Sequence, residues 1–138
     1  PKGLQLTNDS LSQADQIDVE VIPIFVEEES DAETDSFVWA YNIKIQNNST
    51  KPVKLIRRAW KIIDADGTSQ EISGEGVLGK TPTIAARGTH EYSSGVELFS
   101  PSGIMSGFYV MEDEHGNSFK VKIPAFSLDS PYQDISLN

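Results

Sequence analysis

The stretch FVWAYNIKIQ, residues 37–46, decides the fold class of this chain. Large apolar side chains occupy every second position, with small or polar side chains between them. This repeat is typical of a β-strand with one buried face, because successive side chains of a strand point to opposite sides. We therefore predict a strand here, with Trp39 in the middle of its apolar face and buried in the core.

The same alternation continues on both sides of this stretch and is interrupted by clusters of turn residues. Strands are predicted at residues 17–26, 53–63, 68–73, 88–98, 104–112 and 118–128. The apolar parity changes between Val21 and Ile22, which predicts a β-bulge, and Pro23 confines that strand to a sheet edge. In the last strand, Lys120 and Lys122 point away from the apolar side.

No stretch of a dozen residues shows the 3.6-residue period of an amphipathic helix. Seven or eight short strands separated by turn signals indicate an all-β, antiparallel β-sandwich, with a small barrel as the alternative. The length of 138 residues fits one domain. We predict a flexible N-terminal tail at residues 1–16, a sandwich domain at 17–128 and a C-terminal tail at 129–138. The chain begins with Pro1 instead of Met, which leaves open whether residues precede it.

Composition excludes several classes of function. The chain contains no cysteine, so disulfides, thiol catalysis and cysteine-based zinc or iron–sulfur sites are ruled out, and a reducing compartment such as the cytoplasm is expected. The net charge is −10, which argues against nucleic acid as a partner, since such affinity comes largely from Lys and Arg on phosphates. No apolar run approaches the ~20 residues of a membrane span, so no membrane partner is expected.

A glycine-rich motif, GEGVLG at residues 74–79, matches the G-x-G-x-x-G pattern of phosphate-binding loops. Such a loop normally leads into a helix whose N-terminus attracts the phosphate, and Pro82 with its β-branched neighbours prevents a helix here. We interpret the motif as a crossover where the chain bends tightly or packs closely. The alternative hypothesis is an anion or pyrophosphate loop formed by Gly74, Gly76, Gly79 and Lys80, and we expect weak or no nucleotide binding.

A basic stretch stands out in this acidic chain, because residues 50–61 contain five bases and no acid. The simplest interpretation is a charged sheet surface that discourages pairing of strand edges. The alternative is a docking surface for an acidic partner or an anion. The candidate interaction residues are Lys54, Arg57, Arg58 and Lys61.

Acidic residues gather in three places, each of which could be taken for a cation site. Residues 27–35 form an acidic run, and residues 64–67 and 112–117 are polar turns. The first turn resembles the start of a calcium loop, but Ser69 stands where an EF-hand needs glycine, so hairpin turns explain both segments better. We expect no cofactor and no specific metal site. We also expect no catalytic residues, since His90 and His115 lack a nucleophile motif beside them.

Four motifs in order along the chain resemble the ApaG family. They are GEGVLGKTPTI at 74–84, YSSG at 92–95, GIMSGFYVM at 103–111 and IPAFSL at 123–128, and the basic strand around Trp60 agrees with them. The resemblance covers residues 17–128 and departs at Ala86, where a Pro-Gly turn is common in the family. It implies a fibronectin type III-like or immunoglobulin-like sandwich.

The resemblance also implies a context for function. ApaG proteins are small bacterial cytoplasmic proteins that are linked genetically to cobalt resistance and magnesium response. Related domains in eukaryotic F-box proteins and in a DNA polymerase delta-interacting protein look like protein-interaction modules. The family offers no catalytic residues to carry over, and a pyrophosphate site has been proposed for its glycine motif.

We therefore expect a non-enzymatic β-sandwich that mediates protein–protein interaction with a partner not yet identified. Two alternatives stay open. One is binding of pyrophosphate or a nucleotide through residues 74–79 with Lys80 and Arg87, and the other is divalent-cation sensing through the acidic run. The sequence leaves the oligomeric state open, a homodimer included.

Overall fold

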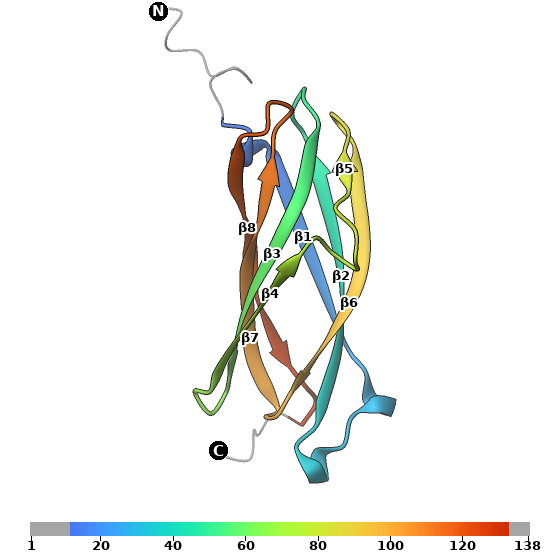
Figure 1. Ribbon diagram of the computed structural model, residues 1–138. Coiled ribbons are helices and arrows are strands. Elements are labelled where there is room, and N and C mark those ends of the chain that lie inside the picture. The colour runs from blue at the N-terminus through green and yellow to red at the C-terminus, as the bar shows by residue number, and fades with distance from the viewer. Residues whose placement is uncertain (1–11, 133–138) are drawn as a thin grey trace, which may run out of the picture.

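A computed structural model describes residues 12–132, which fold into two antiparallel sheets packed face to face (Figure 1). One sheet has the order β1-β2-β6 and the other β4-β3-β7-β8, with the short β5 paired to β3. The all-β sandwich prediction is confirmed. The strands are β1 (Ile17–Phe25), β2 (Phe37–Asn47), β3 (Val53–Asp64), β4 (Ser69–Glu75), β5 (Thr83–Ile84), β6 (Thr89–Leu98), β7 (Ser102–Glu112) and β8 (Ser118–Asp129).

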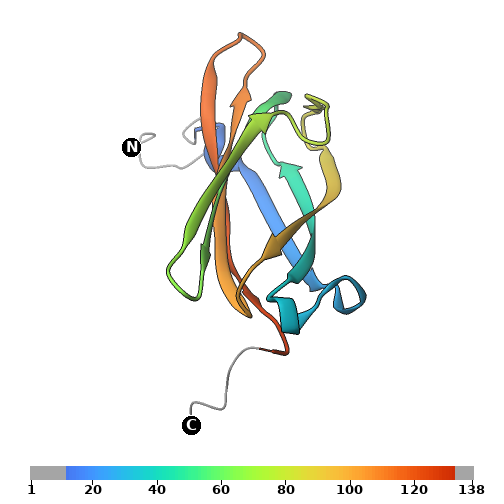
Figure 2. The same ribbon diagram turned by 60° about the horizontal axis from the view of Figure 1, so that its bottom comes forward.

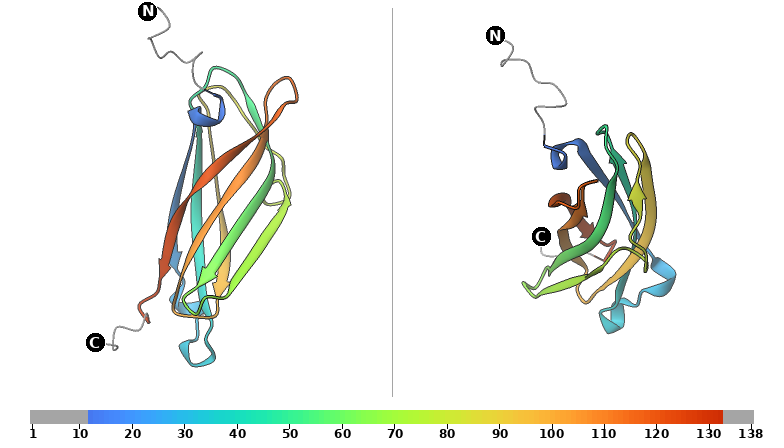
Figure 3. Two further views of the ribbon diagram at one scale, coloured as in Figure 1. Left: turned by 90° about the vertical axis from the view of Figure 1, so that its left-hand side faces the viewer. Right: turned by 45° about the horizontal axis from the view of Figure 1, so that its top comes forward.

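The two layers are seen in the left view of Figure 3, where β8, β7, β3 and β4 lie side by side in front of β1, β2 and β6. The only helices among residues 12–132 are three 3₁₀ turns: η3 (Ala14–Gln16), η4 (Glu27–Glu29) and η5 (Ala32–Thr34). None of them has the length and apolar character to cross a bilayer.

The core lies between the sheets and is built on the predicted alternation. On β2, the five odd-numbered apolar side chains from Phe37 to Ile45 are buried, and Trp39 is only 5% exposed, as predicted. The indole of Trp39 makes an edge-to-face contact with Phe25, their ring centroids 5.3 Å apart. Burial of these large side chains removes apolar area from water, which is the main favourable term in folding.

β1 is an edge strand, paired only with β2, as Pro23 predicts. The predicted bulge between Val21 and Ile22 is wrong, because the register runs without interruption from Ile17 opposite Asn47 to Phe25 opposite Trp39. Ile22 and Ile24 instead lie on the outer face of the sheet, 52% and 46% exposed. Because these two exposed residues are apolar, the apolar positions of the strand changed from odd to even numbers without any bulge.

Two irregularities in strand pairing occur that the alternation of apolar residues does not predict. The pairing of β3 with β7 shifts between Leu55 and Arg57, so that Ile56 is the extra residue of a bulge. The pairing of β7 with β8 shifts between Met105 and Gly107, where the single residue Ser106 lies opposite two residues of β8, Pro124 and Ala125. Each shift changes which side chains of a strand face outward, and both matter for the candidate site.

The two polar turns are hairpins, as expected. Between β3 and β4, the N–H of Gly67 donates to the carbonyl of Asp64 and Gly67 has φ of 90°. Between β7 and β8, the carboxylate of Asp113 accepts hydrogen bonds from the N–H groups of His115 and Asn117 at 2.8 and 2.9 Å. The β3–β4 hairpin and the η4–η5 loop project from the same end of the sandwich (Figure 2).

Most of the two predicted tails, residues 1–11 and 133–138, lies outside the described residues. Within the described part, Ala14 of η3 packs against the core. The side-chain amide of Gln13 donates to the hydroxyl of Ser49 at 3.0 Å. At the other end, the hydroxyl of Tyr132 donates to the carboxylate of Glu27 at 2.6 Å.

Candidate functional site

The three glycines of the 74–79 motif meet three different local requirements. Gly74 lies in β4 opposite Arg58, and a Cβ there would stand 3.0 Å from the guanidinium nitrogens. Gly76 has φ of 62°, and a Cβ there would lie 2.0 Å from the carbonyl oxygen of Lys80. Leu78 and Gly79 have φ of 50° and 76°, the combination that a type I′ turn requires. The structure confirms that the motif bends tightly and packs closely. It is not a crossover, however, because β4 and β5 on either side of it pair with the same edge of β3.

The backbone donors of this loop are largely engaged within the loop and its neighbours. The N–H of Gly76 donates to the carbonyl of Ile56, while Val77 and Lys80 exchange N–H to carbonyl hydrogen bonds of 2.8 and 2.9 Å. A phosphate site needs several N–H donors that converge on one point. Lys80 is exposed, and its ammonium is the one cationic group that the motif itself offers to an anion.

Arg58 is separated from the other candidate bases by the bulge in β3. It lies opposite Tyr109, which is fully buried, and therefore faces the interior. Its Nη1 donates to the carbonyl oxygens of Gly76 at 2.9 Å and Glu75 at 3.2 Å. Arg58 therefore holds the glycine loop against the sheet instead of facing solvent.

A cluster of tyrosines surrounds the guanidinium. The hydroxyls of Tyr92 and Tyr109 are 2.5 Å apart and share a hydrogen bond. Burial raises the pKa of Tyr92 to about 12 and raises the pKa of Tyr109 further, while the charge of Arg58 opposes both shifts. The phenols are therefore neutral at physiological pH, and their hydrogen bond links β6 of one sheet to β7 of the other.

The remaining candidate bases, Lys54, Arg57 and Lys61, lie exposed on the outer side of β3. Strand register brings two further lysines beside them, since Arg57 and Lys120 both lie next to Val110, and Lys122 lies next to Phe108. We call this surface the basic–apolar face. It is formed by Arg57, Ala59, Lys61, Ser106, Phe108, Val110, Lys120 and Lys122.

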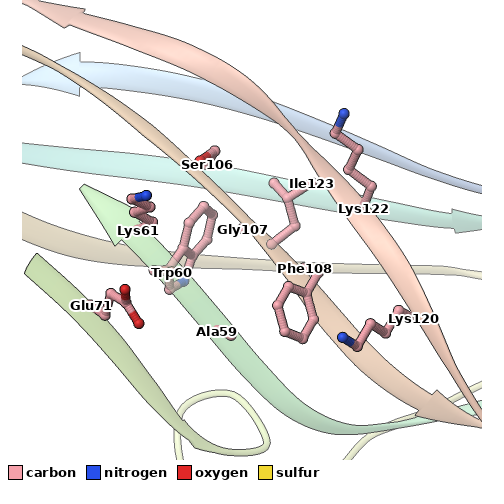
Figure 4. A pocket seen from close by; sticks show the side chains of 10 residues that line it. All are labelled: Ala59, Trp60, Lys61, Glu71, Ser106, Gly107, Phe108, Lys120, Lys122 and Ile123. Atoms are coloured by element: carbon pink, nitrogen blue, oxygen red, sulfur yellow. The ribbon is translucent and has the colours of Figure 1, made fainter. Parts of the chain in front are cut away.

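A depression of about 500 Å³ lies in the basic–apolar face (Figure 4). Ala59, Phe108 and Trp60 line it, and of these the ring of Trp60 is only 4% exposed and packs against Tyr41 and Phe126 in the core. Gly107 packs closely against β3, because a Cβ there would be 2.1 Å from the carbonyl oxygen of Ala59 and 3.1 Å from Cε3 of Trp60. The register shift of β7 against β8 begins at the same residue. The depression therefore lies where β7 and β8 change register.

The charges around this depression are available to a ligand. The ammonium of Lys120 lies 4.6 Å from the ring centroid of Phe108, a cation–π contact, and Lys61 and Lys122 stand at other points of the rim. Within residues 12–132, every ion pair with an N–O distance of 4.0 Å or less involves Glu114. Its carboxylate lies 2.8 Å from the ammonium of Lys51 and 4.0 Å from Nε2 of His115. The bases of the face are thus free of direct ion pairs, although Glu71 lies across from Lys61.

Sequence reasoning found part of this site. It identified the bases of β3 and noted that Lys120 and Lys122 face outward. It missed Phe108 and Gly107, and it did not predict that β7 lies between β3 and β8 and so brings their bases onto one face. Pairing between strands that are distant in the sequence has no local sequence pattern. It also grouped Arg58 with bases from which the bulge removes it.

The acidic run lies in the loop around η4 and η5 and is mostly exposed. The carboxylate of Asp31 accepts a hydrogen bond from the N–H of Glu33 at 3.0 Å, which caps η5. In the part of the chain that the structure describes, no three His, Asp or Glu side chains converge on one point.

Comparison with known proteins agrees with the motifs quoted above. The family model described as the ApaG domain matches residues 27–113. A Protein ApaG from Rhizobium leguminosarum bv. trifolii is 50% identical over 115 residues, which are 83% of this chain and 88% of the relative. A Protein ApaG from Paramagnetospirillum magneticum is 47% identical over 122 residues, 88% and 94% of the two chains.

Solved structures lead to the same result. The crystal structure of an ApaA protein from Bordetella pertussis has a TM-score of 0.81 at 39% identity and covers 83% of this chain and 94% of its own. A protein from Archaeoglobus fulgidus shares the fold alone, with a TM-score of 0.55 at 8% identity and coverage of 82% and 98%. Since the family match and these relatives span most of the chain, the chain belongs to the ApaG family.

Proposed function

We propose that this protein is a non-enzymatic interaction module whose basic–apolar face binds an acidic segment of a protein partner. One observation carries the proposal: an acidic chain places three lysines, Lys61, Lys120 and Lys122, around an apolar depression of about 500 Å³ that also has Glu71 in its lining. Within residues 12–132, none of the three lysines makes an ion pair of 4.0 Å or less. A patch of opposite charge with an apolar centre is typical of an interaction surface.

The chemistry of the depression defines the partner. Phe108, the partly exposed ring of its lining, accepts an aromatic or branched apolar side chain, which is stabilised by leaving water. The ammonium groups of Lys61, Lys120 and Lys122 stand within reach of carboxylates on either side of such an anchor. An acidic segment with one large apolar residue at its centre meets both conditions.

The absence of enzymatic activity belongs to the same proposal. Among residues 12–132, neither His90 nor His115 makes a side-chain hydrogen bond with a hydroxyl that could serve as a nucleophile. The buried phenols stay neutral. The cobalt and magnesium phenotypes linked with the family would then act through the bound partner in the cytoplasm and not through metal held by this chain.

The proposal is tested with a fluorescein-labelled peptide of alternating Glu and Asp around one central Trp, titrated with the protein by fluorescence polarisation. We expect saturable binding that falls at least about tenfold in the Lys120→Glu/Lys122→Glu variant and in Phe108→Ser. Lys44→Glu is the matched control, since it removes one base from the opposite sheet and should leave affinity unchanged. Equal binding by all four proteins would overturn the proposal, as would equal binding of a peptide with Ser in place of Trp.

A further inference from the structure

The outer face of the β1-β2-β6 sheet has the opposite character to the basic–apolar face. Strand register places Ile24, Ala40 and Gly95 in one row across it, with Ile22 in the next row. Ile22 and Ile24 are 52% and 46% exposed, and Ile22 lines a depression of about 410 Å³ together with Glu20, Lys44 and Glu91. Neighbouring isoleucines on a sheet are less favourable in free energy when they are exposed to water than when another surface covers them.

Carboxylates surround this apolar centre. Glu20 and Glu91 lie in one row with Lys44 between them, and Asp18 and Glu97 lie farther along the outer sides of β1 and β6. The face therefore carries four acids and one base. We call it the acidic–apolar face, formed by Asp18, Glu20, Ile22, Ile24, Ala40, Asn42, Lys44, Glu91, Ser93 and Glu97.

The two outer faces complement each other in charge, and each has an apolar centre. One presents two exposed isoleucines flanked by carboxylates, and the other a depression lined by Phe108 and flanked by lysines. We infer that the acidic–apolar face is a docking surface for the basic–apolar face of a second copy of this chain. Ile22 and Ile24 would enter the depression, and Glu20 and Glu91 would meet its ammonium groups.

The geometry of such an association is fixed by the fold. The two faces lie on opposite sides of the sandwich, so one contact joins two different surfaces and leaves one face of each kind free. The chain would therefore associate head to tail, and added copies would extend the assembly. A contact of this kind also covers the site proposed above for an acidic partner, so the partner and a second copy of the chain would compete for the basic–apolar face. This competition rests on the proposed function.

Sedimentation velocity of the whole chain tests the inference, with protein from about 10 µM to about 1 mM. Two variants reverse the faces one at a time: Glu20→Lys/Glu91→Lys and Lys120→Glu/Lys122→Glu. We expect the wild type to associate as concentration rises, each variant alone to need at least about tenfold more protein, and their equimolar mixture to recover association. Recovery in the mixture also shows that both variants are folded.

Glu28→Lys/Glu29→Lys is the matched control for net charge. It changes the charge as much as the first variant but lies on η4, away from the face, and should associate at least as strongly as the wild type. Because Glu20→Lys/Glu91→Lys also lowers the negative charge of the chain, loss of association in that variant cannot come from general repulsion.

The inference is overturned if the wild type stays monomeric throughout, if neither face variant weakens association, or if the mixture fails to recover it. Binding of the labelled peptide shows whether the proposed function fails as well, because it is measured independently of self-association. Glu20→Lys/Glu91→Lys should bind the peptide as well as the wild type at low protein concentration. A chain that associates as described but ignores the peptide would overturn the proposed function alone.

Discussion

The guanidinium of Arg58 lies directly on the backbone of Gly74 in the neighbouring strand, where a Cβ would stand 3.0 Å from two of its nitrogens. Nη1 of the same guanidinium donates to the carbonyl oxygen of Gly76 at 2.9 Å. Arg58 reaches this position because the bulge at Ile56 turns it inward. The glycine motif is therefore fixed by an internal arginine that binds its carbonyl oxygens, whereas a phosphate loop presents its N–H groups.

Alanine substitutions in the motif should lower stability in a definite order. Gly76→Ala should cost the most, about 3 kcal/mol or more, because its Cβ would overlap the Lys80 carbonyl and φ is 62°. Gly79→Ala should cost about 1–2 kcal/mol, since φ is 76° but the space is open. Urea unfolding measures both. Wild-type stability in Gly76→Ala would contradict the backbone described for this loop.

Nucleotides should bind weakly, in keeping with the engaged donors of the loop. We expect ATP and dinucleoside polyphosphates to bind no tighter than roughly millimolar, a free energy of about −4 kcal/mol. NMR titration of labelled protein measures this, with Lys80→Ala as the variant and Lys44→Ala as a matched control away from the loop. Saturable shifts confined to residues 74–80 at micromolar nucleotide, lost in Lys80→Ala, would favour the pyrophosphate alternative.

The acidic run should likewise hold no divalent ion tightly. Its carboxylates lie in an exposed loop, and tight cation sites need a rigid cage of several oxygens. We expect Mg²⁺, Ca²⁺ and Co²⁺ to bind no tighter than roughly millimolar by calorimetry. A stoichiometric micromolar isotherm that disappears in Asp31→Asn/Glu33→Gln/Asp35→Asn would instead support cation sensing.

Strand positions were predictable because alternation is local. The strand predicted at residues 53–63 is β3, Val53–Asp64, and the turns around Gly67 and Gly116 lie where their residues indicated. The site was harder to predict, because it depends on β3, β7 and β8 lying side by side and on two bulges. A bulge such as that at Ile56 depends on how strands that are distant in the sequence pack together, so the residues next to Ile56 contain no pattern that predicts it.

Trp39 should contribute strongly to stability. The side chain is 5% exposed and packs edge-to-face on Phe25, so Trp39→Ala should lower the free energy of unfolding by about 3–5 kcal/mol. Ile63→Ala is a suitable control, since that side chain is 39% exposed on the outer side of β3 and should cost far less. Thermal and urea unfolding compare the two. Equal losses would mean that Trp39 does not belong to the core.

The hydroxyl pair of Tyr92 and Tyr109 should make the protein sensitive to alkali. An unfolded tyrosine has a pKa near 10, whereas burial raises the pKa of Tyr92 to about 12 and that of Tyr109 further. Above pH 10 the unfolded chain therefore binds fewer protons than the folded chain, and the free energy of unfolding falls with pH. The contribution of Tyr92 is complete below about pH 10 and is lost as the pH rises through about 12.

In the Tyr92→Phe/Tyr109→Phe variant, both hydrogen-bonding partners are removed together, so stability at pH 7 should change little. The loss of stability between about pH 10 and 12 should become shallower in this variant. Tyr132→Phe, whose side chain is 43% exposed, should keep most of that loss. Urea unfolding from pH 7 to 12 measures these slopes, and an unchanged slope in the double variant would show that other groups cause the alkaline unfolding.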